Sequence, residues 1–570
     1  MQGKLDESAK PSMIFQNFLN NLKIYLNDEK KNFVELSNKQ LINWDRNIYL
    51  SRTTDINKTN FEGGKINLFQ QFYINKMSER QNEIRKTLLY NCNNNSIDKI
   101  YLLNERLYTE EEIGVSSDKI IQVIINKRMM YSDVFNYVKE NNITGYNIIS
   151  NADIFFDKSI ANIQKCHLIK DKKIYCLNRF DFNNSNLSSL DLDLSGRPDC
   201  QDVWIYHSNY NSILCNNNIF NIELGTPGCD NKIIYLFKLL GFKCYNEPEI
   251  IKTYHYHRIQ TRNYDHNTPR PNYPYYAIFP ALKHHYIDNS RSKKKYSNFD
   301  INEENMKVFD YIKEKITNNV KFIIPQITVP DNNLVYTGVL IGHNKQTVNF
   351  DDLKEDLKIM SNRFVNIINL KDIETYARIY LESFDKCETY IKWEPWGNTY
   401  SQITQSHYFI DENFIKDKYL WGESLFPFYN IWSNSWTLSL KDKNLLIISE
   451  YNTLIREKLD CREKIYGIDL YPNCKFEFID LNIYDKNINY ENLLKNIFTK
   501  IESVKNKFDI ALISAGGLSN LLLSHIHDID KSGVNMNNYL ETSFGIYNSN
   551  FENKHMDILA LYKNEFWNKI

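Results

Sequence analysis

One stretch decides the fold of this chain: Tyr146-Asn-Ile-Ile-Ser-Asn-Ala-Asp-Ile-Phe-Phe-Asp157. Residues 146–149 are mostly apolar and predict a buried strand, which ends in the turn-forming pair Ser150-Asn151. Asp153 follows at the place where an open α/β sheet holds its ligands, just outside the carboxyl end of a strand. A carboxylate there can hold a divalent cation, and the cation can hold a diphosphate. In a second interpretation, Asn151 and Asp153 cap a helix that continues from Asp157.

The composition is that of an ordinary globular protein. The chain has 570 residues, of which 42% are hydrophobic and 24% are charged. This length favours about three or four domains of ~150 residues, or two large ones. The formal net charge is −1, so no global field attracts nucleic acid or an anionic membrane. We therefore expect no nucleic-acid partner.

The cysteines and the apolar runs bear on location. The 10 cysteines include no CxxC pair, which indicates neither a zinc knuckle nor a disulfide framework and favours a reducing compartment. No apolar run reaches the ~18 residues that span a bilayer, and the polar residues 1–7 lack a secretory apolar core. We expect a cytoplasmic protein without a transmembrane segment. The heavy use of Asn, Lys, Ile and Tyr indicates an AT-rich genome, such as that of a giant virus or a parasite. A viral chain would then work in the host cytoplasm.

Strands and helices alternate through the first half of the chain, after a helical N-terminal extension expected at residues 1–60. Apolar runs predict strands at 66–73, 99–103, 119–125, 146–149, 173–177 and 201–206. The capping-box pattern Ser78-Glu-Arg-Gln81 opens one helix, and Tyr131 begins another. This alternation is typical of a mostly parallel α/β sheet. Arg80 and Arg128 stand near the starts of these helices. Each can meet a phosphate or a base, and the alternative is a surface salt bridge.

A second informative segment is Glu223-Leu-Gly-Thr-Pro-Gly-Cys-Asp230. Asp230 begins a predicted helix over 231–240, which Gly241 is suited to end. A short strand then leads to Thr253-Tyr-His-Tyr-His257, where strand alternation puts the two histidines on one face. In the alternative interpretation, Asp230 is an N-cap and the histidines are ordinary surface or core residues.

Taken in order, Asn151-Ala-Asp153, the Gly-x-x-Gly-x-Asp pattern that ends at Asp230, and the His-x-His pair resemble GT-A glycosyltransferases over about residues 60–265. The resemblance implies that Asp153 binds the Mn²⁺ or Mg²⁺ that carries a nucleotide-sugar donor, a UDP-, GDP- or dTDP-sugar. It implies that His255 or His257 completes this metal site. It also implies that Asp230 is the base of an inverting transfer. Arg80, Arg128 and Asn151 are candidates for donor binding. Two acids of the family pattern are absent, because Asn151 opens the Asp-x-Asp motif and Cys229 stands where Glu frequently precedes the base.

The second half follows a Pro-rich linker at 266–298 and predicts another α/β domain at 299–570. We expect strands at 338–342, 444–448 and 509–514. The last strand leads through Ala515-Gly516-Gly517 into a helix, a geometry that presents backbone N–H groups to a phosphate. Tryptophans around Glu394 fit either a sugar-binding cleft or a large core.

This half resembles the GT-D-like glycosyltransferase domains of viral and bacterial glycan-assembly proteins, from about residue 330 to the end. The matching motifs are Trp393-Glu-Pro-Trp-Gly397, Ser406-His407, Arg462-Glu-Lys-Ile-Tyr-Gly-Ile-Asp469, residues 511–520 and Phe544-Gly-Ile546. Glu394, Gly516 and Gly517 are its candidate site residues. Asn537-Asn538 stands where a glycine pair is expected. Because Asn tolerates positive φ, the turn can survive, but close approach to a phosphate is hindered.

We predict an α/β protein with a GT-A-like, Rossmann-like domain at 61–265 and a second Rossmann-like domain at 299–570. As a bifunctional or two-domain glycosyltransferase, it would move a sugar from a nucleotide-sugar donor to a glycan or glycoprotein acceptor. One alternative is a carbohydrate-binding or scaffold protein whose transferase folds have lost activity. Another is a sugar-modifying methyltransferase that uses the Ala515-Gly-Gly517 turn.

Overall fold

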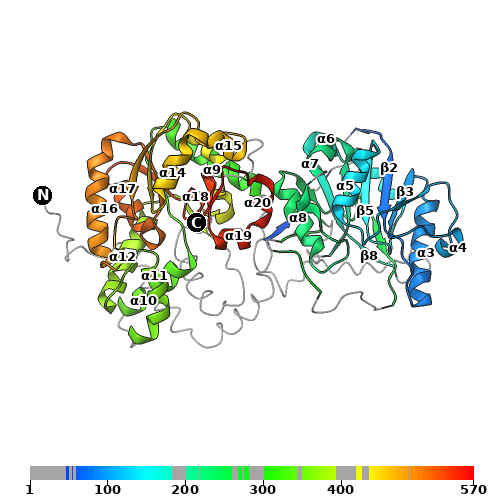
Figure 1. Cartoon of the computed structure of the whole chain (residues 1–570), viewed down its shortest axis with the longest axis horizontal. Coiled ribbons are helices and arrows are strands. Elements are labelled where there is room, and N and C mark those ends of the chain that lie inside the picture. The colour runs from blue at the N-terminus through cyan, green and yellow to red at the C-terminus, as the bar shows by residue number, and fades with distance from the viewer. Residues whose placement is uncertain are drawn as a thin grey trace. The chain divides into compact units, whose positions relative to one another are not determined.

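The computed structural model describes residues 47–50, 54, 60–182, 200–215, 217–259, 268–272, 275–281, 301–342, 350–392, 419–426, 435–485 and 487–570. The chain forms two compact α/β units, which we describe one at a time (Figure 1). The N-terminal unit contains Arg46–Asp300 together with Asn550–Tyr562. The C-terminal unit contains Ile301–Ser549 and Lys563–Ile570. In the part of the chain described, no helix is long and apolar enough to cross a membrane.

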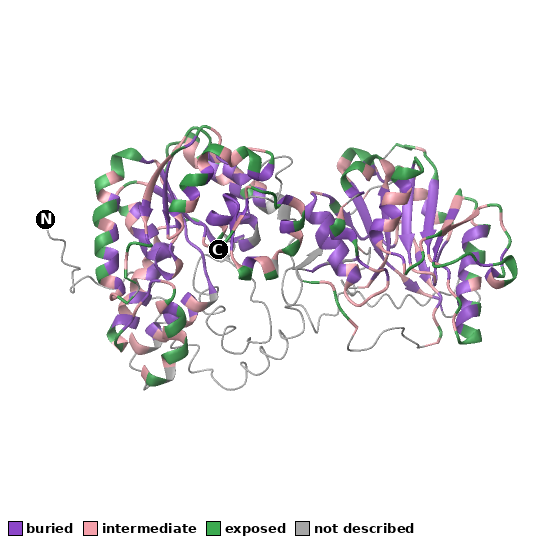
Figure 2. Cartoon of the chain, viewed as in Figure 1, coloured by how far each residue is buried: buried purple, intermediate pink, exposed green. Residues whose placement is uncertain are grey.

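The N-terminal unit is built on a seven-stranded sheet of the order β10-β7-β9-β5-β2-β3-β4. Its strands are β2 (Ile66–Gln70), β3 (Lys99–Asn104), β4 (Ile120–Ile124), β5 (Tyr146–Ser150), β7 (Lys173–Asn178), β9 (Gln201–His207) and β10 (Lys243–Tyr245). All neighbours are parallel except β9, which runs antiparallel to both β5 and β7. The apolar runs that predicted strands are confirmed. The central strands β2 and β5 are buried throughout because both faces of the sheet are covered, as Figure 2 shows.

Helices of the N-terminal unit pack against this sheet. They are α3 (Ser78–Asn93), α4 (Glu110–Ile113), α5 (Tyr131–Glu140), α6 (Leu168–Asp171), α7 (Asn211–Leu214) and α8 (Cys229–Leu239), with 3₁₀ helices η1 (Lys158–Lys165), η2 (Ser208–Tyr210) and η3 (Asn218–Phe220). The predicted capping box of α3 is wrong, because the N-cap is Met77 and no side chain caps it. The Gln81 side chain instead accepts a hydrogen bond from the backbone N–H of Asn75 at 2.6 Å.

A small sheet of three short strands brings distant parts of the N-terminal unit together. Strand β11 (Thr253–His255) runs antiparallel to β6 (Ile154–Phe156) and parallel to β8 (Phe180–Asp181). In this register His255 lies opposite Ile154 on one side and Asp181 on the other. Asp153 directly precedes β6, so pairing alone places it beside the histidine segment.

Three further segments belong to the N-terminal unit. Strand β1 (Asn47–Leu50) pairs in parallel with β12 (Tyr276–Phe279), so segments that the sequence assigned to an extension and to a linker are joined. Helix α20 (Met556–Tyr562) and the residues of α19 (Ser549–Lys554) from Asn550 onward also lie in this unit.

The C-terminal unit has a five-stranded parallel sheet of the order β13-β19-β18-β16-β17. Its strands are β13 (Ile323–Ile324), β16 (Asn444–Ser449), β17 (Lys475–Asp480), β18 (Ile510–Ser514) and β19 (Ser532–Asn535). Smaller pairs are β14 (Tyr390–Lys392) with β15 (Tyr419–Trp421) and β20 (Ile546–Tyr547) with β21 (Asn568–Lys569). The predicted strands at 444–448 and 509–514 are confirmed as β16 and β18.

Helices surround this second sheet and bury a continuous apolar core. They are α9 (Ile301–Thr317), α10 (Val329–Gly342), α11 (Lys354–Ser361), α12 (Leu370–Asp385), α14 (Asn452–Lys458), α15 (Arg462–Tyr466), α16 (Tyr490–Val504), α17 (Ser519–Asp528) and α18 (Tyr539–Ser543). The shorter 3₁₀ segments are η4 (Phe350–Leu353), η5 (Gly422–Leu425), η6 (Trp436–Leu440), η7 (Leu459–Cys461), η8 (Lys505–Lys507) and η9 (Gly516–Leu518). The turn at Asn537 survives as expected, with a positive φ of 48°.

The strand predicted at 338–342 is wrong, because these residues form the end of helix α10. A short apolar run fits a buried helix as well as a buried strand. Gly338 explains how the helix is buried. A Cβ at this position would lie 2.6 Å from both the Cβ of Ala377 and the carbonyl oxygen of Ile373. Glycine is therefore needed for the backbones of α10 and α12 to approach each other.

A buried carboxyl group joins two strands at the reversal of strand order in the C-terminal unit. Ser449 ends β16 and Ser514 ends β18, and the two are opposite each other in the sheet. Their hydroxyls donate to the two carboxyl oxygens of Glu541 at 2.6 and 3.0 Å. Burial raises the pKa of Glu541 from 4.5 to about 7, although the serine hydroxyls oppose the shift.

Glu541 should make the C-terminal unit less stable as pH rises. Between pH 4.5 and about 7 the native carboxyl holds a proton that the unfolded chain has lost. The free energy of unfolding should therefore fall across this window, by up to about 3 kcal/mol. Glu541→Gln should flatten that fall, whereas Glu457→Gln on the exposed side of α14 should not. Denaturant unfolding of the full chain from pH 4.5 to 8, followed in this unit by hydrogen exchange, measures the difference. An equally steep fall in the Glu541→Gln variant would refute this role.

Candidate metal and donor site

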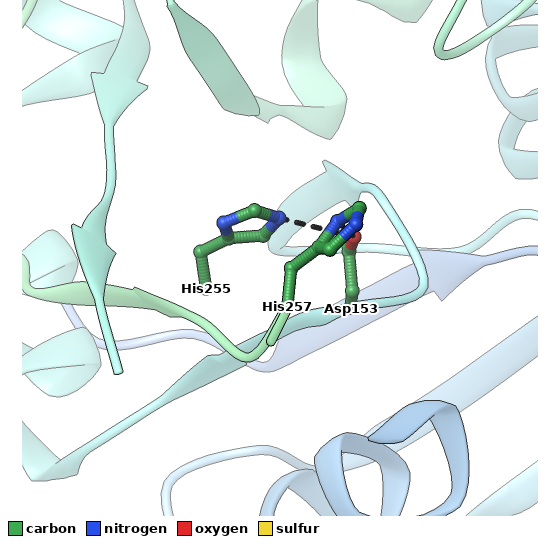
Figure 3. Close-up of side chains that lie close together, drawn as sticks. All are labelled: Asp153, His255 and His257. Atoms are coloured by element: carbon green, nitrogen blue, oxygen red, sulfur yellow. Dashed lines mark hydrogen bonds and ion pairs between the residues drawn. The ribbon is translucent and has the colours of Figure 1, made fainter. Parts of the chain in front are cut away.

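Three potential metal ligands gather at the end of β5. The carboxylate of Asp153 and the imidazoles of His255 and His257 offer one ligand atom each, and these atoms lie within 4.8 Å of one another (Figure 3). Asp153 Oδ2 is 3.1 Å from Nε2 of His255 and 3.4 Å from Nδ1 of His257. His255 ends β11, and His257 follows two residues later. The predicted grouping of one carboxylate with two histidines is thus present in the geometry.

The interpretation of Asn151 and Asp153 as helix caps is wrong. The helix that follows is the 3₁₀ segment η1, and its N-cap is Asp157, whose side chain accepts from the N–H of Ser159. Asp153 is instead buried, with its carboxylate among cationic and imidazole groups. Burial would raise the pKa of Asp153, but His255, His257 and Arg80 outweigh burial and hold it well below its usual value.

A second carboxylate orients His255. Asp181 Oδ1 lies 3.0 Å from Nδ1 of His255, while Nε2 faces Asp153. A metal would be bound by the neutral ring, in which the proton stays on Nδ1 toward Asp181 and the Nε2 lone pair is on the side of Asp153. Metal-binding histidines in proteins are usually held by a partner of this kind. Burial disfavours the imidazolium, yet the two carboxylates prevail and raise the pKa of His255 to about 9.

Arg80 lies at the centre of the site, where the sequence placed a donor-binding candidate. One guanidinium nitrogen is 2.5 Å from Asp153 Oδ2, and another is 2.8 Å from a carboxylate oxygen of Glu83. Arg80 also donates to the backbone carbonyl of Tyr256 at 3.3 Å. Its side chain is only 7% exposed, so the alternative of a surface salt bridge is wrong. The residue balances the buried carboxylate of Asp153.

Asn151, two residues before Asp153, contacts another acidic residue. Its side-chain amide donates to Asp202 Oδ1 at 2.6 Å. Asp202 also forms an ion pair with Arg179, which lies 3.9 Å from Asp181. Asp202, near the start of the antiparallel strand β9, is thus the acid that contacts the Asn151 side chain. Asp181, Asp202 and the site role of Arg179 were missed by the sequence analysis.

Arg128 and Asn151 both lie close to Gly225. A Cβ built on Gly225 would be 3.2 Å from Nη2 of Arg128 and 3.6 Å from Oδ1 of Asn151. Arg128 Nε donates to the carbonyl of Leu224 at 3.0 Å, and its side chain is 37% exposed. The glycine-containing segment before α8 therefore passes directly beside two predicted donor-binding residues.

Asp230 stands in the first turn of α8, but it is not the N-cap. The N-cap is Gly228, with a positive φ of 82° and no side chain to accept a hydrogen bond. The capping interpretation of Asp230 is therefore wrong. Burial raises the pKa of Tyr131 well above its usual value, and the charges of Asp230 and Asp202 add to the rise. The charges of Asp230 and Asp202 thus both act on this one buried tyrosine.

The described ligand set fits a first-row divalent metal. Ligand atoms bound to one such ion at about 2.0–2.2 Å lie no more than about 4.4 Å apart, close to the spacing seen here. Two imidazoles and one carboxylate favour transition metals, whereas Mg²⁺ prefers carboxylate, carbonyl and water oxygens. Mn²⁺ accepts both kinds of ligand. The residues therefore suit Mn²⁺ better than Mg²⁺.

The candidates in the C-terminal unit have a different arrangement. The N–H of Gly517 donates to the backbone carbonyl of Arg363 at 3.0 Å. A Cβ on Gly516 would lie 2.8 Å from the same carbonyl oxygen. In this conformation the glycine turn packs against the chain, and the Gly517 N–H is engaged by protein. Glu394 lies outside the described residues.

No family model and no curated protein matches the chain. Among solved structures, one similar chain is a mannosyltransferase, PcManGT from Pyrobaculum calidifontis in complex with GDP-Man and Mn²⁺. It has 9% identity and a TM-score of 0.25, over 54% of this chain and 76% of that one. Another is S. aureus TarS 1–349 in complex with UDP-GlcNAc, with 8% identity and a TM-score of 0.22, over 56% of this chain and 85% of that one. At these scores the likeness carries no argument about function, which therefore depends on the site itself.

Asp181 should set the metal affinity of the site without being a ligand. We expect Asp181→Asn to weaken Mn²⁺ binding by about 10–100-fold, because an amide lacks the negative charge that raises the basicity of the imidazole. Isothermal titration calorimetry with Mn²⁺ measures the change. The control is Glu140→Gln, on the exposed end of α5. Unchanged affinity in Asp181→Asn would show that the charge of Asp181 does not act on the metal through His255.

Proposed function

We propose that the chain is a metal-dependent glycosyltransferase whose N-terminal unit transfers a sugar from a nucleotide-sugar donor to a hydroxyl of a glycan or glycoprotein. The observation that carries this proposal is the grouping of Asp153, His255 and His257 at the end of β5. A ligand site at the carboxyl end of a strand is what an open α/β sheet provides. The residues around it supply both the cations and the acids that transfer chemistry needs.

The donor diphosphate would lie beside Asp153. A divalent metal at this position supplies charge neutralisation of the nucleotide diphosphate leaving group. Asp153, His255 and His257 would hold it, and Asp181 would keep His255 aligned. Arg80 and Arg179 are cations already held in place by carboxylates, so they add positive charge without a large reorganisation. Asn151 and Arg128 border the same place and would contact the donor.

Asp230 would take the proton from the acceptor hydroxyl. It lies at the N-terminal end of α8, where the helix dipole favours the ionised carboxylate. A base must be within hydrogen-bond reach of the attacking hydroxyl, on the face of the sugar opposite the leaving group. Attack from that face inverts the configuration of the anomeric carbon. The C–O bond to the nucleotide breaks as the new C–O bond to the acceptor forms, and the proton passes to Asp230.

We propose that the C-terminal unit, near the predicted domain 299–570, is a second transferase-like or carbohydrate-binding module. In its parallel sheet β17 lies on one side of β16 and β18 on the other, so the strand order reverses at β16. Doubly wound sheets bind small molecules at such a reversal. A methyltransferase role of the Ala515-Gly-Gly517 turn gains no support, because the Gly517 N–H is bonded to Arg363.

Asp153 should be required for metal binding and for donor turnover. We expect Asp153→Asn to lose at least 100-fold in Mn²⁺ affinity and to abolish the Mn²⁺-stimulated hydrolysis of UDP-, GDP- and dTDP-sugars. The reason is that an amide carries no charge to hold a cation, and Arg80 keeps only Glu83 as an acidic partner. We also expect Mn²⁺ to activate the wild-type protein more than Mg²⁺ does, because two of the three ligands are imidazoles.

Calorimetry and a nucleotide-release assay over all three donor classes measure these effects. Glu140→Gln again serves as the matched acid-to-amide control. Wild-type Mn²⁺ binding by Asp153→Asn would place the metal elsewhere. A wild-type protein that binds Mn²⁺ but releases nucleotide from none of the donors would favour the carbohydrate-binding alternative.

Asp230 should act in the chemical step alone. We expect Asp230→Asn to lower kcat by ~10²–10⁴-fold, the usual contribution of a general base, and to leave donor KM and Mn²⁺ affinity within twofold. Since Gly228 is the N-cap, the substitution should leave the thermal unfolding midpoint almost unchanged. Kinetics of donor turnover and NMR of the product anomer provide the measurements. Near-normal kcat, or a product that retains the donor configuration, would defeat the assignment.

A further inference from the structure

Helix α8 carries the proposed base and is buried on almost every side. Ten of its eleven residues are buried, including Asn231, Lys232 and Lys238. An amphipathic surface helix would expose such polar residues to water. Among the residues of this helix, Asp230 is the one that is half-buried rather than buried. Some other element must therefore cover the polar face of α8.

For Lys232 that element is α20, from the far end of the sequence. The ammonium of Lys232 forms an ion pair with Asp557, 325 positions later in the chain. The Lys232 side chain is 3% exposed and the Asp557 side chain is 12% exposed. Figure 1 shows α20, in red, beside α8, in green. Asn272, just before β12, also contacts Met556 of α20, with 3.0 Å between Nδ2 and Sδ.

Apolar contacts keep α20 in this place, and the buried ion pair is costly to break. Ile558, Leu559 and Tyr562 are buried. Burial lowers the pKa of Lys232 and raises that of Asp557, so desolvation outweighs the attraction within the pair. Such a pair contributes little net stability while it is intact, but removal of one partner leaves an uncompensated buried charge. Lys232 therefore depends on Asp557 to remain a buried cation.

The contact between Lys232 and Asp557 joins α8 to a segment whose neighbours in sequence belong to the other unit. Asn550–Tyr562 lies in the N-terminal unit, although the residues on both sides of it, Ser549 and Lys563, belong to the C-terminal unit. The segment is thus a strap that leaves one folded unit, packs in the other and returns. Its anchor on α8, Lys232, is two residues from Asp230.

We propose that Asp557 is a positioning residue of the N-terminal site: through Lys232, α20 holds the first turn of α8 and so fixes Asp230 toward the acceptor. The inference rests on the proposed function for its catalytic part. Asp557 itself touches no donor or acceptor in this scheme. The C-terminal strap is accordingly a component of the N-terminal catalytic unit, and a fragment that ends before it would carry an unpaired Lys232.

The test uses full-length variants. Asp557→Asn should lower the kcat of donor turnover at least tenfold and leave Mn²⁺ affinity and donor KM within twofold, because the metal ligands lie on other elements. Hydrogen exchange over 228–235 should become at least tenfold faster, while exchange over 146–150 and 444–449 stays unchanged. The charge-reversed pair Lys232→Asp with Asp557→Lys should restore kcat and exchange to within threefold of wild type. Asp528→Asn, which breaks the Lys386–Asp528 pair of the C-terminal unit, is the matched control.

A double-mutant cycle separates positioning from general destabilisation. If Asp557 acts through Asp230, then Asp557→Asn should lower kcat no further in the Asp230→Asn background. An equal loss in both backgrounds, a parallel loss of Mn²⁺ affinity, or unchanged exchange over 228–235 would each overturn the proposal. If the wild-type protein turns over no nucleotide sugar, the proposed function fails, but the exchange experiment still decides whether the strap holds α8.

Discussion

The buried negative charge of Asp153 is the constraint on which the N-terminal unit depends. A carboxylate removed from water must be paired, and three side chains share this task. Arg80 reaches it from α3, and His255 and His257 reach it from the end of β11 and the residues just beyond. Asp181 then balances His255 from β8. Removal of any one of these elements would leave a charge unpaired, so the small three-stranded sheet and the main sheet are linked through electrostatics as well as packing.

The same arrangement brings a second acid close to Asn151. Position 151 is an amide, and amides donate as well as accept. Asn151 uses its donor to hold Asp202 at 2.6 Å, and Asp202 in turn holds Arg179. A negative charge is kept near the site, but it comes from β9 instead of the loop after β5. Because Arg179 is fixed between Asp202 and Asp181, the site also gains a cation whose position is set before any ligand arrives.

The C-terminal unit also has a parallel sheet, but the side chains at its strand ends are different. Its switch point carries serine hydroxyls bonded to a buried glutamic acid, and the N–H of Gly517 nearby is bonded to the carbonyl of Arg363. The glycines after β18 permit close packing against Arg363.

The sequence by itself determined the local elements and the residue types of the site. Apolar runs of the right length located β2, β3, β4, β5, β16 and β18, and the order of Asp153, Asp230 and the histidines located the candidate chemistry. The sequence prediction failed at 338–342, because a short apolar run fits a buried strand and a buried helix equally well. These residues are helical, and Gly338 lets the backbones of α10 and α12 lie close together. Only the tertiary structure decided which charges meet. Asp202 approaches Asn151 because β9 runs antiparallel to β5, and Asp557 reaches Lys232 from 325 positions away. Such contacts depend on strand direction and chain path, and no local pattern of residues records either.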